Sequence, residues 1–230
     1  MKIIEKINKC DNDFQNNPQP MIAFFGDSVT QGYFFDTTNY NEVYHNKVRQ
    51  WLNLFYPDAP VNILNSGLGG TRATFGAERI ERDVISKKPD LCVVCFGLND
   101  IGDLEGGIPI FQKALSDIFT ALENAGIEII YMTPNMYNTT YIPERTPEIS
   151  KEFAQIAPKW QNGGLMDKYV DAMRETAAKH NVPICDCYAI WKRLSVNGVN
   201  TTRLLANGIN HPLPKMHDIF AYELIKMMFG

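Results

Sequence analysis

MIAFFGDSVTQG, residues 21–32, is a short apolar run that breaks directly into a turn. Met21–Phe25 has the length and composition of a buried strand, and Gly26 and Asp27 then supply residues typical of turns. A serine that follows such a strand is held rigidly and faces the crevice where open α/β sheets bind their ligands. The stretch therefore predicts an α/β fold with Ser28 at one edge of its sheet.

Four more apolar runs of strand length follow along the chain, and a helical pattern lies between each run and the next. The expected strands are Met21–Phe25, Val61–Leu64, Leu91–Phe96, Ile127–Met132 and Val182–Cys185. The expected helices are Asn41–Tyr56, Ala77–Ser86, Pro109–Asn124, Leu165–Lys179 and His217–Met228. Leu91–Phe96 is apolar on both faces, as in parallel sheets that are covered on both sides. The alternation predicts a five-stranded parallel sheet joined by right-handed crossovers.

The chain of 230 residues shows no linker, internal repeat or low-complexity segment. We therefore expect a single domain over residues 1–230, with residues 1–18 as an N-terminal extension. Residues 133–164 are rich in Pro, Asn, Thr and Tyr and interrupt the alternation. We expect an irregular insertion there, either a binding loop or lid or a partly helical segment.

Bulk composition narrows the classes of function. Hydrophobic residues make up 45% and charged residues 21%, as in ordinary globular proteins. The net charge of −4 and the lack of a basic cluster argue against nucleic acid as a partner. No apolar run has the length of a membrane span, and the first ten residues lack the apolar core of a signal peptide.

The five cysteines form no disulfide framework. Cys92 and Cys95 are three positions apart in one expected strand and so point to opposite faces, which disfavours a shared metal or redox site. We expect a cytoplasmic protein without membrane insertion, metal or cofactor. The oligomeric state is left open.

Three further polar segments carry candidate chemistry. NSGLGGT at 65–71 and GLND at 97–100 each follow an expected strand, and NGINHP lies at 207–212. Because the carboxyl ends of parallel strands meet at one edge of the sheet, we expect these segments to converge on Ser28.

These segments contain what acyl transfer requires. A serine hydroxyl becomes a nucleophile when a base takes its proton, and His211 is the best placed base, ahead of the other three histidines. The backbone N–H groups of Ser28 and Gly70 and the side-chain amide of Asn99 could stabilise the oxyanion. An ordinary imidazole as base predicts that kcat/KM rises with pH through a pKa of about 6–7.

The order of the four segments resembles the SGNH, or GDSL, hydrolase family, over Gly26 to Pro212. The resemblance implies a flavodoxin-like three-layer α/β/α fold with Ser28 as nucleophile and His211 as base. It also implies an oxyanion hole of Ser28, Gly70 and Asn99. Aligning Asn65 with the asparagine that often opens the second family motif places the oxyanion glycine at Gly70 rather than Gly67.

One position departs from the family pattern. The family usually has an aspartate three residues before the histidine, where this chain has Gly208 next to the uncharged Asn207. We expect that a backbone carbonyl or a remote carboxylate, with Asp186 and Asp218 as candidates, orients His211. Otherwise the enzyme is slow, because the orienting group fixes the tautomer of the imidazole.

The leading prediction is a serine esterase that forms an acyl-serine intermediate, with short-acyl or O-acetyl carbohydrate esters favoured. Lysophospholipase or thioesterase activity is the alternative within the family, and a non-catalytic carbohydrate- or ester-binding module is a third reading. A nucleotide- or flavin-binding domain is disfavoured because residues 67–72 lack the last glycine of G-x-G-x-x-G. The absence of G-x-S-x-G argues against a nucleophile-elbow hydrolase.

Some neighbouring residues have an open role. Arg72 could contact an anionic substrate or a surface carboxylate. The aromatic side chains of residues 133–164 could line a substrate pocket, although packing is the usual role of such residues; they include Tyr137, Tyr141 and Trp160.

Overall fold

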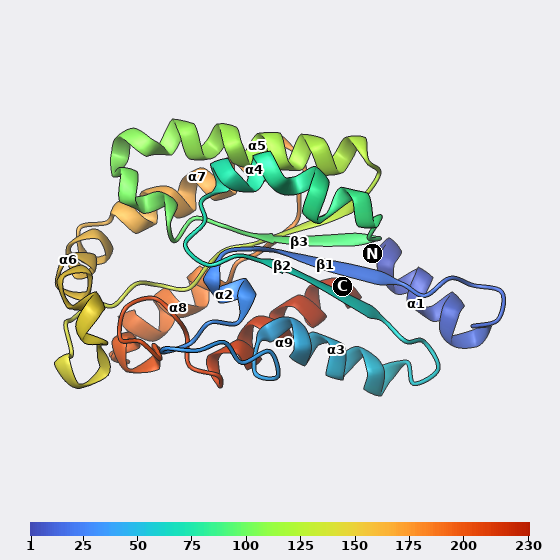
Figure 1. The fold of residues 1–230 in the computed structure, drawn as a ribbon, viewed down its shortest axis with the longest axis horizontal. Helices are drawn as coiled ribbons and strands as arrows, with labels where there is room; N and C mark the ends of the chain where they lie inside the picture. The colour runs from blue at the N-terminus through green and yellow to red at the C-terminus, as the bar shows by residue number, and fades with distance from the viewer.

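The computed structural model describes all 230 residues, with a parallel sheet between two layers of helices (Figure 1). The strands are β1 (Met21–Gly26), β2 (Asn62–Gly67), β3 (Leu91–Cys95), β4 (Glu128–Met132) and β5 (Ile184–Cys185). Neighbouring strands all pair in parallel, in the order β2-β1-β3-β4-β5. This is the flavodoxin-like order, so the predicted three-layer α/β/α fold is confirmed.

The connections decide which helices cover which face. The chain passes from β1 to β2 in one direction across the sheet and from β2 onward in the other. Right-handed crossovers therefore place the helix after β1 and those after β2 on opposite faces. One layer holds α4 (Ala73–Asp83), α5 (Ile108–Asn124) and α7 (Leu165–Lys179). The other holds α3 (Tyr44–Phe55), α8 (Cys187–Val196) and α9 (Met216–Phe229) (Figure 1).

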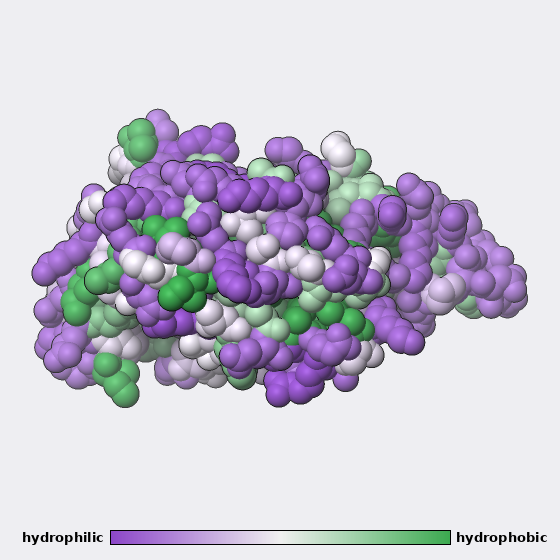
Figure 2. All heavy atoms as spheres, turned by 90° about the horizontal axis from the view of Figure 1, so that it is seen from above, coloured by the Kyte–Doolittle hydropathy of each residue, from purple (hydrophilic) through white to green (hydrophobic).

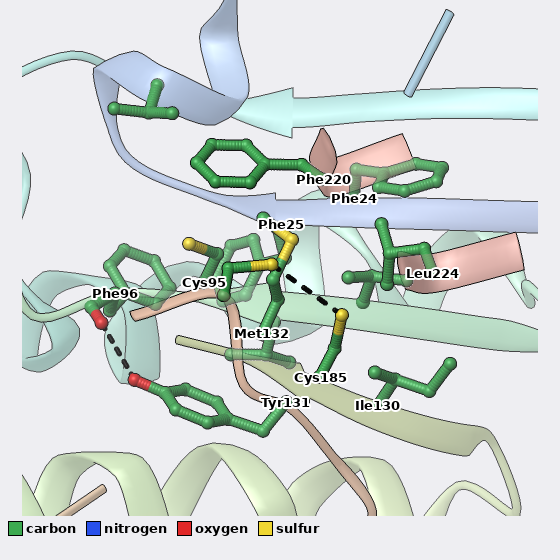
Figure 3. Close-up of a cluster of buried hydrophobic side chains, with 14 of the residues drawn as sticks. Phe24, Phe25, Cys95, Phe96, Ile130, Tyr131, Met132, Cys185, Phe220 and Leu224 are labelled. Atoms are coloured by element: carbon green, nitrogen blue, oxygen red, sulfur yellow. Dashed lines mark hydrogen bonds between the residues drawn. The ribbon is translucent and has the colours of Figure 1, made fainter. Parts of the chain in front are cut away.

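The two faces of the sheet share one continuous hydrophobic core. Adjacent residues of a strand point to opposite faces, so Phe24 lies beside Phe220 of α9 whereas Phe25 points the other way (Figure 3). Phe25 meets Phe96 edge to face, with ring centroids 5.1 Å apart. The sheet is thus packed on both sides, which fixes the strand ends that carry the site.

Two helices lie outside the five helices that the sequence predicts, one at the N-terminus and one in the insertion. Residues 1–18, expected as an extension, contain α1 (Lys2–Asn12), which buries Ile3, Ile7 and Cys10 in the core. These three residues have helical spacing, but charged residues between them hide the pattern. Residues 133–164 contain α6 (Lys151–Asn162), so the insertion is partly helical, the second of the two alternatives.

Two more helices follow strand ends: α2 (Ser28–Gln31) after β1, where a turn was expected from the sequence, and α8 after β5, where no helix was expected. Each begins behind an aspartate whose side chain accepts a backbone N–H of the first turn. None of the helices is both long enough and apolar enough to cross a membrane.

All strands run toward the same edge of the sheet, on the left in Figure 1. Figure 2 looks onto the layer of α4 and α5 and shows a mainly hydrophilic surface. Hydrophobic patches interrupt it in the left half, on the side of the carboxyl ends of the strands, and also to the right of its centre (Figure 2). The candidate site lies at this edge, where β1 leaves the sheet between its neighbours β2 and β3.

Candidate active site

Ser28 is the first residue of the one-turn helix α2. Asp27 caps this helix, because its Oδ1 accepts the N–H of Val29 at 2.9 Å. Gly32 ends it in the left-handed conformation, and its N–H donates to the Ser28 carbonyl at 3.1 Å. The side chain of Ser28 is thus carried on a turn that is fixed at both ends and leaves the residue 8% exposed.

His211 lies in contact with Ser28, as the sequence predicts. Its Nε2 is 2.8 Å from Ser28 Oγ, and its Nδ1 is 2.8 Å from the carbonyl oxygen of Phe34. A carbonyl oxygen only accepts hydrogen bonds, so Nδ1 carries the proton. The lone pair of Nε2 therefore faces the serine hydroxyl, which is the tautomer that a general base needs.

The Phe34 carbonyl is itself held in place. Tyr33 and Thr38 form an antiparallel bridge, and the N–H of Phe34 donates to the carbonyl of Thr37 at 3.0 Å. The buried Phe34 ring packs against His217, with centroids 5.0 Å apart. A backbone group in a closed hairpin thus orients His211, one of the two arrangements expected from the sequence.

Asn207 shapes the loop of His211 and does not replace the missing acid. Its Oδ1 accepts three backbone N–H groups at 3.0 Å, those of Ile209, Asn210 and His211. This fixes the orientation of the amide, so the group that lies 3.1 Å from His211 Nδ1 is Nδ2, a donor. It cannot accept the Nδ1 proton.

The expected remote carboxylates do not contact His211. Asp186 accepts from Arg174 and caps α8, and Asp218 pairs with Lys47. The remote carboxylate, the second of the two arrangements left open by the sequence, is therefore not the one found, because each carboxylate is engaged by a nearby cation.

Gly208, at the position of the family aspartate, has φ +65°. A Cβ there would lie 3.1 Å from the Arg145 carbonyl oxygen. Both features disfavour a side chain at this position.

Burial changes the titration of the base. Desolvation lowers the pKa of His211 to about 4, and the hydrogen bond to Phe34 offsets only part of this effect. The residue is 9% exposed and has no carboxylate partner that would stabilise the imidazolium. The pKa of about 6–7 expected from an ordinary imidazole is therefore revised downward, and His211 is neutral at neutral pH.

The glycines after β2 differ in what they contact. A Cβ on Gly67 would lie 2.2 Å from the backbone nitrogen of Gln31, so this glycine allows β2 to pack against α2. The N–H of Gly69 donates to Gln31 Oε1 at 2.7 Å. Gly70 has φ +72°, and a Cβ on it would meet no atom within 4 Å. The N–H groups of Ser28 and Gly70 have no acceptor in the chain.

Asn99 lies next to this glycine segment. Its Nδ2 donates to the Thr71 carbonyl at 2.9 Å, and a primary amide has a second N–H to offer. Asp100 Oδ1 accepts the N–H of Ala73 at 2.9 Å, and Arg72 pairs with Asp103. The loops after β2 and β3 are thus tied together, and Arg72 binds a surface carboxylate of its own chain.

Three tyrosine hydroxyls hold the loop that carries Asn99, a feature the sequence analysis missed. Tyr131 Oη donates to the Phe96 carbonyl at 2.7 Å, as the dashed line in Figure 3 shows. Tyr137 Oη donates to the Leu98 carbonyl at 2.5 Å, and Tyr169 Oη to the Asp100 carbonyl at 3.0 Å. Alternate carbonyls of the loop are therefore fixed from β4, from the insertion and from α7. Tyr137 is buried by this role and does not line a substrate pocket.

The other histidines do not contact Ser28. His45 Nε2 lies 3.1 Å from the carbonyl oxygen of Thr30, and His217 Nδ1 accepts the N–H of Tyr44 at 3.2 Å. Burial lowers the pKa of both, to about 4 and about 3. Neither histidine can act as the base for Ser28.

A second serine–histidine contact lies far from the strand ends. Ser116 Oγ is 2.7 Å from His180 Nε2, and His180 Nδ1 is 3.1 Å from Glu123. Ser116 sits inside α5, where backbone N–H groups are used by the helix itself. No free N–H group can serve an oxyanion there, so the contact resembles a triad only in its side chains.

The chain is similar to proteins of one known family. Residues 24–219 match the GDSL-like Lipase/Acylhydrolase family. The uncharacterized lipoprotein YqeF of Bacillus subtilis (strain 168) is 28% identical over 215 residues, which cover 84% of this chain and 83% of that protein.

Solved structures share the fold at lower identity. An acetylxylan esterase from Geobacillus stearothermophilus is 20% identical, with a TM-score of 0.67 over 90% of this chain and 93% of its own. A gut microbial diltiazem-metabolizing enzyme, also 20% identical, has a TM-score of 0.71 over 90% of this chain and 46% of its own.

The family match covers more than half of the chain, and it contains Ser28 and the polar segments at 65–71, 97–100 and 207–212. The predicted serine hydrolase class agrees with this match, and the fold agrees with that of solved esterases. The chain therefore belongs to the GDSL-like Lipase/Acylhydrolase family, whose members are hydrolases that act on ester bonds.

Proposed function

We propose that this protein is a serine esterase in which Ser28 and His211 act as a dyad on short-acyl esters, among them O-acetylated carbohydrates. The observation that carries the proposal is the 2.8 Å contact between Ser28 Oγ and His211 Nε2, with Nδ1 bound to a backbone carbonyl. This arrangement prepares a hydroxyl for deprotonation without an acidic residue.

The first half of the reaction forms the acyl-enzyme. Ser28 Oγ attacks the ester carbonyl carbon while His211 Nε2 takes the hydroxyl proton. The carbonyl oxygen becomes an oxyanion, which accepts hydrogen bonds from the N–H groups of Ser28 and Gly70 and from the Asn99 amide. The tetrahedral intermediate then expels the alcohol, and His211 gives it the proton.

The second half regenerates the enzyme. Water enters the place of the alcohol, and His211 Nε2 takes one of its protons as the oxygen attacks the acyl carbon. A second oxyanion forms at the same donors, and its collapse releases the carboxylic acid and returns the proton to Ser28 Oγ.

The carbonyl of Phe34 does part of what a carboxylate does in related enzymes. Solved catalytic mutants of the acetylxylan esterase replace a serine, a histidine and an aspartate, and that aspartate lies three positions before the histidine. A carbonyl fixes the tautomer of His211 equally well. It carries no full charge, so it stabilises the imidazolium less than a carboxylate would.

Two observations favour short acyl groups. A long acyl chain needs an apolar groove that leads from the nucleophile. The groove between α4 and α5, about 570 Å³ in volume and lined by Ala77, Ile110 and Ala114, contains neither Ser28 nor His211, so it does not serve an ester bound at Ser28. The structural neighbours include an acetylxylan esterase.

We expect kcat/KM to fall from acetyl to butyryl to octanoyl 4-nitrophenyl esters, and a maximum at octanoyl would favour the lysophospholipase or thioesterase alternative.

Replacing Asn99 by alanine should lower kcat by about 10²–10³-fold, because one oxyanion donor is lost. KM should change little, since the donor acts mainly on the charge that develops in the transition state. Steady-state kinetics on 4-nitrophenyl acetate measures both values. An unchanged kcat in a protein with normal thermal unfolding would remove Asn99 from the oxyanion hole.

Replacing Asn207 by aspartate should raise the pKa of His211. The new carboxylate oxygen would take the place of Nδ2, 3.1 Å from Nδ1. An opposite charge at such a distance shifts a pKa by about 1–3 units, in favour of the protonated imidazole. The acid limb of kcat/KM should therefore move to higher pH, which a pH profile detects.

The matched control for this variant is Asn12→Asp, which adds the same charge at the end of α1, near the amino ends of the strands and away from the candidate site (Figure 1). Its profile should equal that of the wild type. Equal shifts in both variants would mean that net charge, and not the contact with Nδ1, moves the limb.

We also infer a reducing, cytoplasmic location, because all five cysteines are buried and free. Fractionation of cells that produce the protein, with a membrane-bound lipoprotein as reference, tests this location. Recovery in the membrane fraction would overturn it and match the lipoprotein name of the Bacillus subtilis relative.

A further inference from the structure

A polar cavity of about 440 Å³ opens beside the candidate nucleophile, between the end of α2, the start of α3 and the edge strand β2. Gln31 forms part of its wall, and Gln31 Oε1 accepts the N–H of Gly69 at 2.7 Å. A Cβ on Gly69 would lie 2.9 Å from that oxygen and 3.6 Å from Ser28 Cβ. One side chain and one glycine therefore separate the cavity from Ser28.

The walls carry hydrogen-bonding groups that the chain does not use. Gln31 Nε2 has no partner. The contact between His45 Nε2 and the Thr30 carbonyl means that Nε2 carries the proton, and Nδ1 keeps a free lone pair. Arg49 uses a single N–H, which donates to Asn46 Oδ1 at 2.7 Å. The cavity thus offers unused donors and an unused acceptor.

The acceptor persists at neutral pH. His45 is 4% exposed, and this burial, together with the charge of Arg49, lowers its pKa to about 4. The imidazole is therefore neutral, and Nδ1 remains a hydrogen-bond acceptor.

This mixture of groups matches hydroxyls better than it matches an anion. A hydroxyl both donates and accepts, so it can bond to Arg49 or Gln31 on one side and to His45 on the other. A carboxylate or phosphate only accepts and would face the lone pair of His45. At the rim, Tyr40 is 58% exposed and presents an apolar ring face beside polar groups. The volume is in the range of small-molecule sites.

We propose that this cavity binds a neutral sugar unit of the substrate, next to the unit that carries the ester. The catalytic consequence rests on the proposed esterase function. The binding itself does not, because an unacetylated sugar can occupy the cavity without any reaction.

The binding test uses the Ser28→Ala protein, which cannot turn over a substrate. We titrate it by calorimetry with three neutral probes, xylotetraose, cellotetraose and maltotetraose, and expect saturable binding of at least one. Tyr40→Ala in the same background should weaken this binding about tenfold, because a stacking face is lost. Tyr222→Ala is the matched control: Tyr222 lies on α9, outside the cavity, and is 59% exposed.

Three results would overturn the inference: no binding of any neutral probe, equal affinity in the Tyr40→Ala and Tyr222→Ala proteins, or tighter binding of trigalacturonic acid than of the neutral probes.

A kinetic measurement adds the link to catalysis. Tyr40→Ala in the active enzyme should raise KM for acetylated oligosaccharides about tenfold and leave kcat/KM for 4-nitrophenyl acetate within about twofold. If the esterase function fails, the titration still decides whether the cavity binds sugar.

Discussion

Replacing Ser28 by alanine is expected to lower kcat/KM for 4-nitrophenyl acetate by about 10⁴-fold or more. The expectation follows from the position of Oγ, 2.8 Å from Nε2 of a neutral imidazole, on a residue whose own backbone N–H has no acceptor in the chain. Removing the oxygen leaves only the oxyanion donors and substrate binding, which account for a small residual rate. Thermal unfolding should change little, because the substitution removes one hydroxyl and its single side-chain hydrogen bond, the contact with His211.

A covalent probe separates this prediction from loss of folding. Incubation of the wild-type protein with a fluorophosphonate should give a single adduct by intact-mass spectrometry, and peptide mapping should locate it at Ser28. Ser116→Ala is the matched control, because Ser116 also contacts a histidine but lies within a helix. It should keep full activity and full labelling. An adduct at Ser116, or full activity without Ser28, would contradict the assignment.

The sequence predicts the class of fold and the main contact of the site because both depend on short, local patterns. Apolar runs of strand length, separated by helices, predict a parallel sheet, and a polar residue after a strand must lie at its carboxyl edge. Ser28 and Asn99 are placed this way. His211, which follows no strand, is placed by the resemblance to the family.

The remaining features depend on groups that leave no mark in the sequence. The partner of His211 is a backbone carbonyl, which every residue has, so nothing distinguishes Phe34 before the hairpin is known. The tyrosines that hold the Asn99 loop come from three separate elements, and their roles arise only when those elements pack. The pKa of His211 is lowered by burial, which a sequence motif does not report.

Replacing His211 by glutamine is expected to lower kcat/KM by about 10⁴-fold at pH 8, similar to the loss for Ser28→Ala. Combining both substitutions should add little, since nucleophile and base act as one unit. In the wild type, kcat/KM should rise with pH through a pKa of about 4 and then stay level near neutrality, because the base is deprotonated there. His180→Gln is the matched control, as His180 also contacts a serine, and it should retain wild-type activity.

The acid limb must be separated from two other effects. His45, His211 and His217 are buried and neutral in the folded protein, but they take up protons in the unfolded chain below a pKa of about 6.5. The free energy of unfolding therefore falls as pH drops from about 6.5 toward 4, and circular dichroism at each pH restricts the profile to folded protein. Burial also raises the pKa of Asp27 to about 7. A limb near pH 7 that Asn207→Asp does not move would assign the titration to Asp27 and contradict His211 as the group that controls the rate.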